Sequence, residues 1–379
     1  MKRREFIRFA GAAAIAPELL RPVGRDRPIG PRVRLPWPGY DAAFVVDALA
    51  GPIQFNIPQG TLPLGDEALD DVRRSGITAV NLTVNARATD SGSAFDNTRD
   101  RIASWVRELE AHPMSLVGVR SVADLRDAKA SQRLGLILGF QDTVPVEDDL
   151  GRIDDFYDVG VRIIQLTYNT TNKIGSGCLA SEDTGLSELG AEAVARMDEK
   201  RLLIDLSHCG RRTTLDGIRT SIRPVAITHS GCAAVFRHPR SKDDATLRLL
   251  AEKGGVLGIY FMPFLNPSGP PSAEHVLAHI EHALNVCGEE HVGIGSDQGI
   301  VPLDVGGDFA ERFEDVSKQR AAAGIAAPRE DTIPYVPDLN HPRRLEAIAD
   351  RMAARGHANR VIEKVLGANF MRLFEEVWG

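Results

Sequence analysis

The sequence predicts a (β/α)₈ barrel, in which eight parallel strands alternate with helices. Short apolar runs rich in β-branched residues alternate with longer amphipathic stretches along the 379 residues. Several of these runs are almost continuously apolar, as strands buried on both faces are. A doubly wound sheet could use the same elements, but no glycine-rich phosphate loop follows the first strand, which disfavours that alternative.

The predicted elements follow one another in a regular order. The eight strands are expected at residues 43–47, 77–84, 134–140, 161–167, 202–207, 224–228, 255–260 and 292–296. Helices are expected at residues 67–75, 97–111, 190–200, 212–221, 243–253 and 273–287, with a last helix at 343–366. Residues 299–342 contain prolines and glycines and interrupt the alternation, so we expect a long loop or lid over the open end of the barrel.

The N-terminus predicts export. Arg3 and Arg4 precede a short apolar stretch, as in a twin-arginine signal, and this stretch is shorter than the roughly 20 apolar residues of a membrane-spanning helix. We expect a twin-arginine signal at 1–25, a proline-rich linker at 26–42 and the barrel domain at 43–379. The signal implies the twin-arginine export machinery as a partner and an exported, periplasmic or cell-envelope location, whereas a basic tail is the alternative.

The composition excludes some classes of protein. A net charge of −7 argues against a nucleic-acid-binding protein, which would present a basic face. The four cysteines form no Cys-x-x-Cys pair, so neither a zinc ribbon nor a disulfide scaffold is indicated.

Three side chains at strand ends predict a metal-type site. Active sites of these barrels lie at the carboxyl ends of the strands, where His208 and His229 follow the fifth and sixth strands and Asp297 follows the eighth. Two imidazoles and a carboxylate suit Zn²⁺, which would activate a bound water. Asp297 could bind the metal or act as the general base. A structural role for each histidine is the alternative.

Other strand-end residues extend the predicted site. Gln141 follows the third strand, and Tyr168 and Asn169 follow the fourth. Arg240 stands eleven residues after His229, and a guanidinium there could hold a substrate carboxylate with two hydrogen bonds. A surface arginine is the alternative reading of Arg240.

The motifs around these residues resemble those of the membrane dipeptidase (renal dipeptidase, peptidase M19) family. The resemblance rests on Asp-Leu-Ser-His208, Thr-His229-Ser, His-Pro-Arg240, Gly-Ile-Gly-Ser-Asp297 and Gly-Ala-Asn-Phe-Met-Arg-Leu-Phe, the last beginning at Gly367. It implies a barrel of the metal-dependent hydrolase type, a binuclear zinc site, dipeptide hydrolysis and a possible homodimer. It also implies that both histidines bind zinc, that Asp297 serves the metal and the proton transfers, and that Arg240 holds the dipeptide carboxylate.

The chain departs from the family pattern at several metal ligands. The family's first-strand histidine and aspartate are Leu49 and Gly51 here, the bridging glutamate is Gln141, and the histidine after the fourth strand is Tyr168. A neutral amide offers one oxygen and no charge to a metal pair. We therefore expect one zinc per chain or none, with His208, His229, Asp297 and Gln141 as the candidate ligands.

The sequence thus predicts an exported hydrolase that cleaves a dipeptide or similar small amide with metal-activated water. In this interpretation Asp297 and Tyr168 are catalytic, with Tyr168 donating to the oxyanion, and Arg240 and Asn169 contact the substrate. Two alternatives stay open. One is altered chemistry on a non-peptide amide, and the other is a non-catalytic binding protein with a degenerate metal site.

Overall fold

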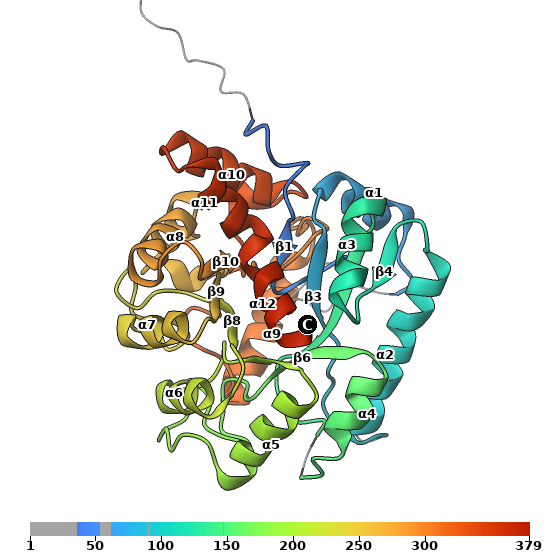
Figure 1. Ribbon diagram of the computed structural model, residues 1–379, viewed down its shortest axis with the longest axis vertical. Coiled ribbons are helices and arrows are strands. Elements are labelled where there is room, and N and C mark those ends of the chain that lie inside the picture. The colour runs from blue at the N-terminus through green and yellow to red at the C-terminus, as the bar shows by residue number, and fades with distance from the viewer. Residues whose placement is uncertain (1–35, 54–61, 90, 147) are drawn as a thin grey trace, which may run out of the picture. The chain divides into compact units, whose positions relative to one another are not determined.

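The computed structural model describes residues 36–53, 62–89, 91–146 and 148–379, which belong to one compact unit that begins at Pro36. Eight parallel strands form the wall of a barrel in the order β1-β3-β5-β6-β7-β8-β9-β10 (Figure 1). These strands are β1 (Val46–Asp47), β3 (Ala79–Thr83), β5 (Leu134–Phe140), β6 (Val161–Gln165), β7 (Leu203–Asp205), β8 (Ala226–Ser230), β9 (Val256–Ile259) and β10 (Val292–Ile294). Each strand lies within a predicted strand or overlaps one. The predicted (β/α)₈ barrel is confirmed.

Two short strands help to close the barrel between its first and last strands. The Ala48 N–H donates to the Ile294 carbonyl at 2.9 Å. Just beyond, β2 (Ala50–Gly51) pairs in parallel with β11 (Gln298–Gly299). A third short strand, β4 (Leu116–Gly118), pairs with the beginning of β5 and was not predicted.

Helices alternate with the strands around the barrel. They are α1 (Asp66–Ser75), α2 (Ala94–Ala111), α3 (Val122–Ser131), α4 (Arg152–Asp158), α5 (Glu188–Glu199), α6 (Arg211–Thr220), α7 (Asp244–Glu252), α8 (Ala273–Cys287), α9 (Phe309–Ala322), α10 (Arg344–Ala354), α11 (Asn359–Glu363) and α12 (Asn369–Trp378). Shorter turns are the 3₁₀ segments η1 (Pro263–Leu265) and η2 (Pro337–Leu339) and a π-helical turn, η3 (Lys364–Ala368).

The prediction of one helix over 343–366 is wrong. The chain there forms α10 and α11, which are separated where Gly356 takes a left-handed conformation, with φ of 88°. Gly has no Cβ and adopts this conformation without steric cost. Gly367 then allows a close approach to β1, because a Cβ at that position would lie 2.3 Å from the Phe44 carbonyl oxygen.

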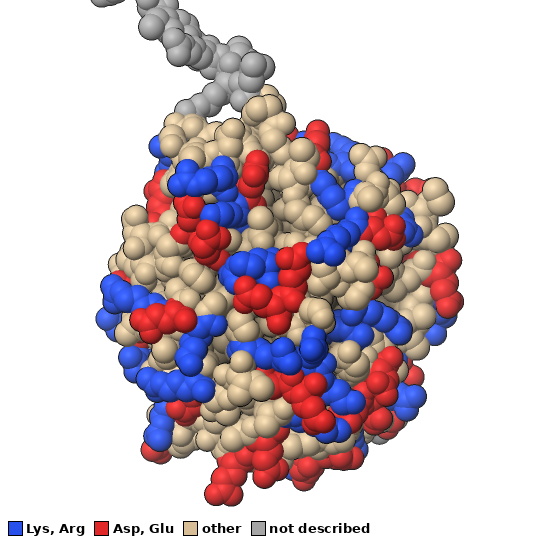
Figure 2. All heavy atoms as spheres, viewed as in Figure 1, with Lys and Arg blue, Asp and Glu red and all other residues tan. Residues whose placement is uncertain are grey.

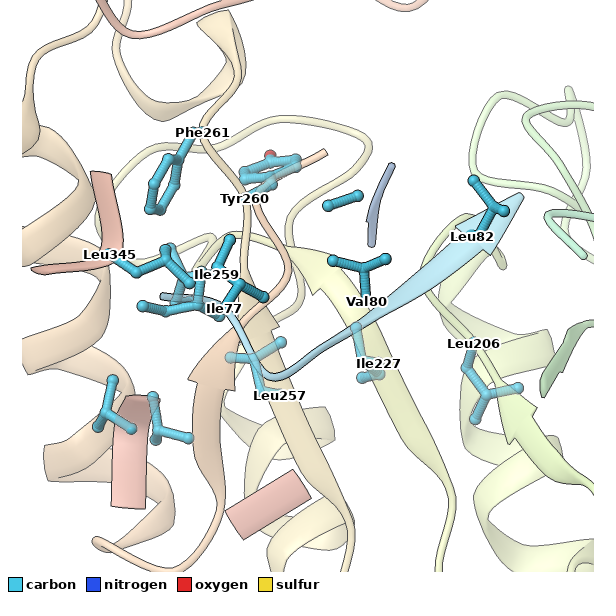
Figure 3. Close-up of a cluster of buried hydrophobic side chains, with 14 of the residues drawn as sticks. Ile77, Val80, Leu82, Leu206, Ile227, Leu257, Ile259, Tyr260, Phe261 and Leu345 are labelled. Carbon is cyan, nitrogen blue, oxygen red and sulfur yellow. The ribbon is translucent and has the colours of Figure 1, made fainter. Parts of the chain in front are cut away.

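Apolar side chains from the strands and the surrounding helices form the main core. Figure 3 shows Val80 and Leu82 of β3 together with Ile227 of β8 and Leu257 and Ile259 of β9. All five are almost completely buried. Burial of such side chains stabilises the fold by roughly 1.5–3 kcal/mol each relative to exposure.

The last helix covers the amino-terminal end of the barrel. Phe370, Leu373, Phe374 and Val377 of α12 pack in one cluster with residues near the beginnings of β1, β3, β7, β8 and β9. Figure 1 shows α12 at the centre of the view, surrounded by the strands. The opposite end, at the carboxyl ends of the strands, is therefore the one available for a ligand.

The predicted signal at 1–25 and residues 26–35 of the predicted linker lie outside the described residues. Residues 36–42 pack on the barrel unit, where Trp37 and Tyr40 are buried and the Trp37 Nε1 donates to Asn359 at 3.0 Å. No helix in the described ranges has the length and apolar character to cross a membrane. On the face shown in Figure 2, acidic and basic side chains are interspersed.

Candidate active site

A cavity of about 180 Å³ brings strand-end residues together with the segment predicted as a lid. From the barrel come Tyr168, His208, Arg240 and Asp297. From residues 299–342, here called the lid segment, come side chains of α9 and of the loop after it. The α9 residues are Phe313, Val316, Ser317 and Arg320. Their spacing of three and four residues places them on one face of the helix.

The two predicted histidines meet in the structure. The Nε2 atoms of His208 and His229 are 3.0 Å apart, and both rings are buried. The His208 ring also stacks on Tyr168, with ring centroids 4.1 Å apart. Burial, together with the positive charge of Arg240, holds the pKa of both imidazoles well below the usual value, so both rings are neutral.

The hydrogen bonds at the Nδ1 atom of each ring determine which ring nitrogen carries the proton. His208 Nδ1 faces the Asn169 Oδ1 at 2.6 Å, and an amide oxygen only accepts, so this Nδ1 carries the proton and Nε2 is an acceptor. His229 Nδ1 lies 2.8 Å from the Thr228 hydroxyl, which is bonded to Asp205 at 2.6 Å. Burial raises the pKa of Asp205, whereas the hydrogen bonds it accepts from Ser207 and Thr228 lower it.

The hydrogen bonds behind His229 end on the Asp205 carboxylate. The Thr228 hydroxyl donates to Asp205, so its oxygen accepts from His229 Nδ1. The Nε2 atoms of His229 and His208 then present lone pairs to each other. The pair can therefore hold one proton or another cation between its two Nε2 atoms.

Asp297 lies where the barrel closes. Its backbone is in the left-handed region with φ of 59°, and its N–H donates to the Leu49 carbonyl at 2.8 Å. Such a conformation is uncommon outside glycine and often marks a functional position. Gly295 before it is required sterically, since a Cβ there would lie 1.9 Å from the Thr228 carbonyl oxygen.

Arg240 is a buried cation without an acidic partner in the described part of the chain. Its side chain donates to the His229 carbonyl at 3.0 Å and lies over the Tyr260 ring, whereas its Nε has no hydrogen-bond partner among the described residues. Only 1% of the residue is exposed. A buried guanidinium is stabilised by an anion, and the cavity it lines is the place from which an anion could approach.

The other predicted site residues have different positions. The Tyr168 hydroxyl accepts a hydrogen bond from Arg320 at 3.4 Å, and burial raises its pKa, so it keeps its proton. The Asn169 side chain does not line the cavity, because its amide group donates to Ile325 of the lid segment and its oxygen faces His208. Gln141 does not line it either, and its amide group donates to Thr83 at 2.9 Å.

The strand-one aspartate is held in a buried ion pair. Asp47 accepts from the Ser296 backbone at 2.6 Å and from Arg344 at 3.0 Å, and both charged residues are at most 2% exposed. Arg344 lowers the pKa of Asp47 against the larger effect of burial. The Asp47 carboxylate therefore makes structural contacts with Ser296 and Arg344 and is not available to a ligand.

The residues present do not fit a zinc centre as they lie. Two nitrogens bound to one tetrahedral zinc are about 3.3 Å apart, so His208 and His229 match two ligand positions. Catalytic zinc takes three protein ligands, but no group of three or more His, Cys, Asp and Glu side chains placed to hold a metal ion occurs in the described ranges. Leu49, buried beside Asp297, supplies no donor.

Sequence reasoning missed the lid residues and the groups behind the histidines. Glu330 pairs with Arg320 at 2.7 Å, and both line the cavity. The helical spacing Phe313, Val316, Ser317 and Arg320 was a usable signal within the predicted lid. The contact of Thr228 with Asp205 has no such signal, because it joins different strands.

Comparisons with known proteins agree on one family. The family model for membrane dipeptidase (peptidase family M19) matches residues 54–322. Dipeptidase verJ of Clonostachys rogersoniana is 28% identical over 263 residues, which are 68% of this chain and 65% of that protein. An uncharacterized dipeptidase of Schizosaccharomyces pombe is 32% identical over 193 residues, 49% of this chain and 45% of that protein. The chain thus spans two thirds or less of these relatives.

Solved structures give the same result for the fold. An amidohydrolase from Pseudomonas aeruginosa superposes with a TM-score of 0.76 and 30% identity, covering 90% of this chain and 98% of that one. A metallopeptidase from Rhodobacter sphaeroides, solved with a phosphinate mimic of the dipeptide L-Ala-D-Ala, has a TM-score of 0.69 and 20% identity, covering 89% and 99% of the two chains.

Proposed function

Because this chain belongs to the membrane dipeptidase family, we propose that it is a hydrolase of a dipeptide or a similarly small amide that carries a free carboxylate. The cavity of about 180 Å³ is smaller than the roughly 300–1,000 Å³ of sites for drug-sized ligands, which favours a small substrate. The Rhodobacter relative binds a dipeptide mimic, which supports the same class.

The proposal rests on the burial and the charge environment of Arg240. Its guanidinium is buried, has no acidic partner in the described part of the chain and lines the same cavity as His208 and Asp297. A substrate carboxylate supplies the missing anion through charge-assisted hydrogen bonds. The amide to be cleaved then lies within the length of one residue from Arg240, beside the imidazole pair.

The remaining cavity residues supply the proposed chemistry. Asp297 acts as the general base toward water, and Tyr168, which keeps its proton, donates to the developing oxyanion. The His208 and His229 pair can take up one proton between its Nε2 atoms, beside the reacting amide, and release it again. Phe313 and Val316 of α9 cover the cavity, which helps to exclude water.

Metal content is the first measurement. Two imidazoles, with no third ligand placed beside them in the described ranges, limit the predicted zinc to one per chain or none. Elemental analysis of protein purified without chelator should give at most one zinc, and His208→Ala should remove it. Two equivalents of zinc would contradict the ligand assignment.

The activity test compares dipeptides with matched dipeptide amides, which lack the carboxylate. Release of free amino acid is expected from a dipeptide and not from its amide, because only the dipeptide carries the anion for Arg240. Equal turnover of both would contradict the role of Arg240.

A binding protein is the second candidate, favoured because the described residues place no third metal ligand beside the two histidines. Binding of a dipeptide in calorimetry without turnover, with or without added zinc, would support it over the hydrolase. Export by the twin-arginine route, an envelope location and a homodimer are also part of the proposal. Fractionation of cells that express the full chain, and the mass of the purified protein in solution, test them.

A further inference from the structure

His238 lies between Arg240 and the lid segment. It is 6% exposed, its Nδ1 accepts a hydrogen bond from the Arg240 backbone N–H at 3.1 Å, and its Nε2 donates to the Pro328 carbonyl at 2.9 Å. A carbonyl only accepts, so the proton is on Nε2 and Nδ1 presents a lone pair. One neutral ring therefore joins the loop after β8 to the lid segment.

Packing fixes the orientation of this ring. His238 stacks on Phe264 with centroids 4.4 Å apart and an interplanar angle of 8°, and Phe264 lines the cavity. Burial lowers the pKa of His238 to about 4, which keeps it neutral and preserves both hydrogen bonds at neutral pH.

On the lid segment, the hydrogen-bond partner of His238 is next to residues that line the cavity. Pro328 is followed by Arg329 and Glu330, which both line the cavity. Glu330 in turn pairs with Arg320 of α9. The Pro328 carbonyl is therefore two residues from Glu330, through which the loop is joined to α9.

We propose that His238 is a positioning residue that couples closure of the lid segment to the placement of Arg240. This inference rests on the proposed function, in which Arg240 binds the substrate carboxylate. His238 does not line the cavity, so it acts through its two hydrogen-bond partners.

Three substitutions separate the two hydrogen bonds. In His238→Gln the amide nitrogen can still donate to Pro328, but the acceptor for Arg240 is lost. In His238→Asn the amide oxygen can still accept from Arg240, but the donor to Pro328 is lost. His238→Phe keeps the stacking on Phe264 and loses both bonds. The control is His282→Gln on α8, whose ring bonds to Asp244 away from the cavity.

Amide hydrogen exchange measures the effects of losing the Arg240 hydrogen bond and the Pro328 hydrogen bond separately. Loss of one such bond is expected to speed exchange about 3- to 10-fold on its own side. His238→Gln should speed exchange of the Arg240 amide and raise KM by a similar factor. His238→Asn should speed exchange of residues 313–330, His238→Phe should do both, and the control should do neither. The same pattern for the Gln and Asn variants, or no change in the Phe variant, would overturn the proposal.

The wild-type protein provides an independent test that does not depend on the variants folding. Saturating alanyl-alanine should slow exchange of the Arg240 amide and of residues 313–330 together, and protection of one without the other would overturn the coupling. If alanyl-alanine does not bind at all, the proposed function fails, whereas the exchange pattern of the variants still decides the role of His238.

Discussion

Replacing Arg240 with methionine is expected to weaken ligand binding without destabilising the fold. The substitution removes one hydrogen bond to the His229 carbonyl, worth about 1 kcal/mol, and a cation–π contact with Tyr260 of about 0.5–1 kcal/mol. It also removes a buried Nε without a partner, which costs about 1–3 kcal/mol in the wild type. The free energy of unfolding of the ligand-free protein should therefore stay unchanged or rise slightly.

Arg344→Met is the matched control, because Arg344 is equally buried and its Nε also lacks a partner among the described residues, but its Nη2 pairs with Asp47. Its removal leaves Asp47 as a buried carboxylate without its cation, at a cost of about 3–5 kcal/mol. Urea unfolding of both variants measures the two effects. Calorimetry with a dipeptide should show a loss of about 2–5 kcal/mol in binding for Arg240→Met. Equal destabilisation by both substitutions would refute the reasoning, because Arg240 would then be a structural residue.

Two further predictions concern Tyr168, which lines the cavity, and His279, a buried residue of α8. Tyr168→Phe should lower kcat about 100-fold or more while leaving KM and thermal stability nearly unchanged, and an unchanged kcat would remove Tyr168 from the oxyanion role. Stability should also depend on His279, whose pKa is lowered to about 4 by burial. Between pH 6.5 and 4 the unfolded state binds this proton and the folded state does not, so stability falls as the pH falls. Urea unfolding of wild type and His279→Gln over this range should differ in slope by about 1.4 kcal/mol per pH unit, and equal slopes would contradict the burial argument.

The barrel and the centre of the site were predictable for a physical reason. Strands buried on both faces are apolar throughout, so their ends are visible in the sequence, and parallel strands bring those ends to one place. The strand Leu134–Phe140 and the helix Ala273–Cys287 have the bounds predicted for them. The same logic brings His208 and His229 into contact.

The parts that were missed depend on contacts between distant residues. Arg344 and Asp47 are 297 positions apart, and no local pattern indicates that they pair. The lid helix α9 was missed because only Phe309 along it is buried, so its apolar periodicity is weak. One miss is local instead: the predicted helix over 343–366 breaks after α10 at Gly356, which takes a left-handed conformation that ends a helix.

The charged groups that line the cavity have one electrostatic consequence. Three guanidinium groups, those of Arg240, Arg320 and Arg329, line the cavity with two carboxylates, those of Asp297 and Glu330. Leucine at position 49 and glutamine at position 141 add no negative charge. A second divalent cation would therefore enter a region that already has excess positive charge, whereas a ligand carboxylate would neutralise it. The cavity is therefore expected to favour an anion over a second cation, and Arg240 is the group on which that anion is expected to bind.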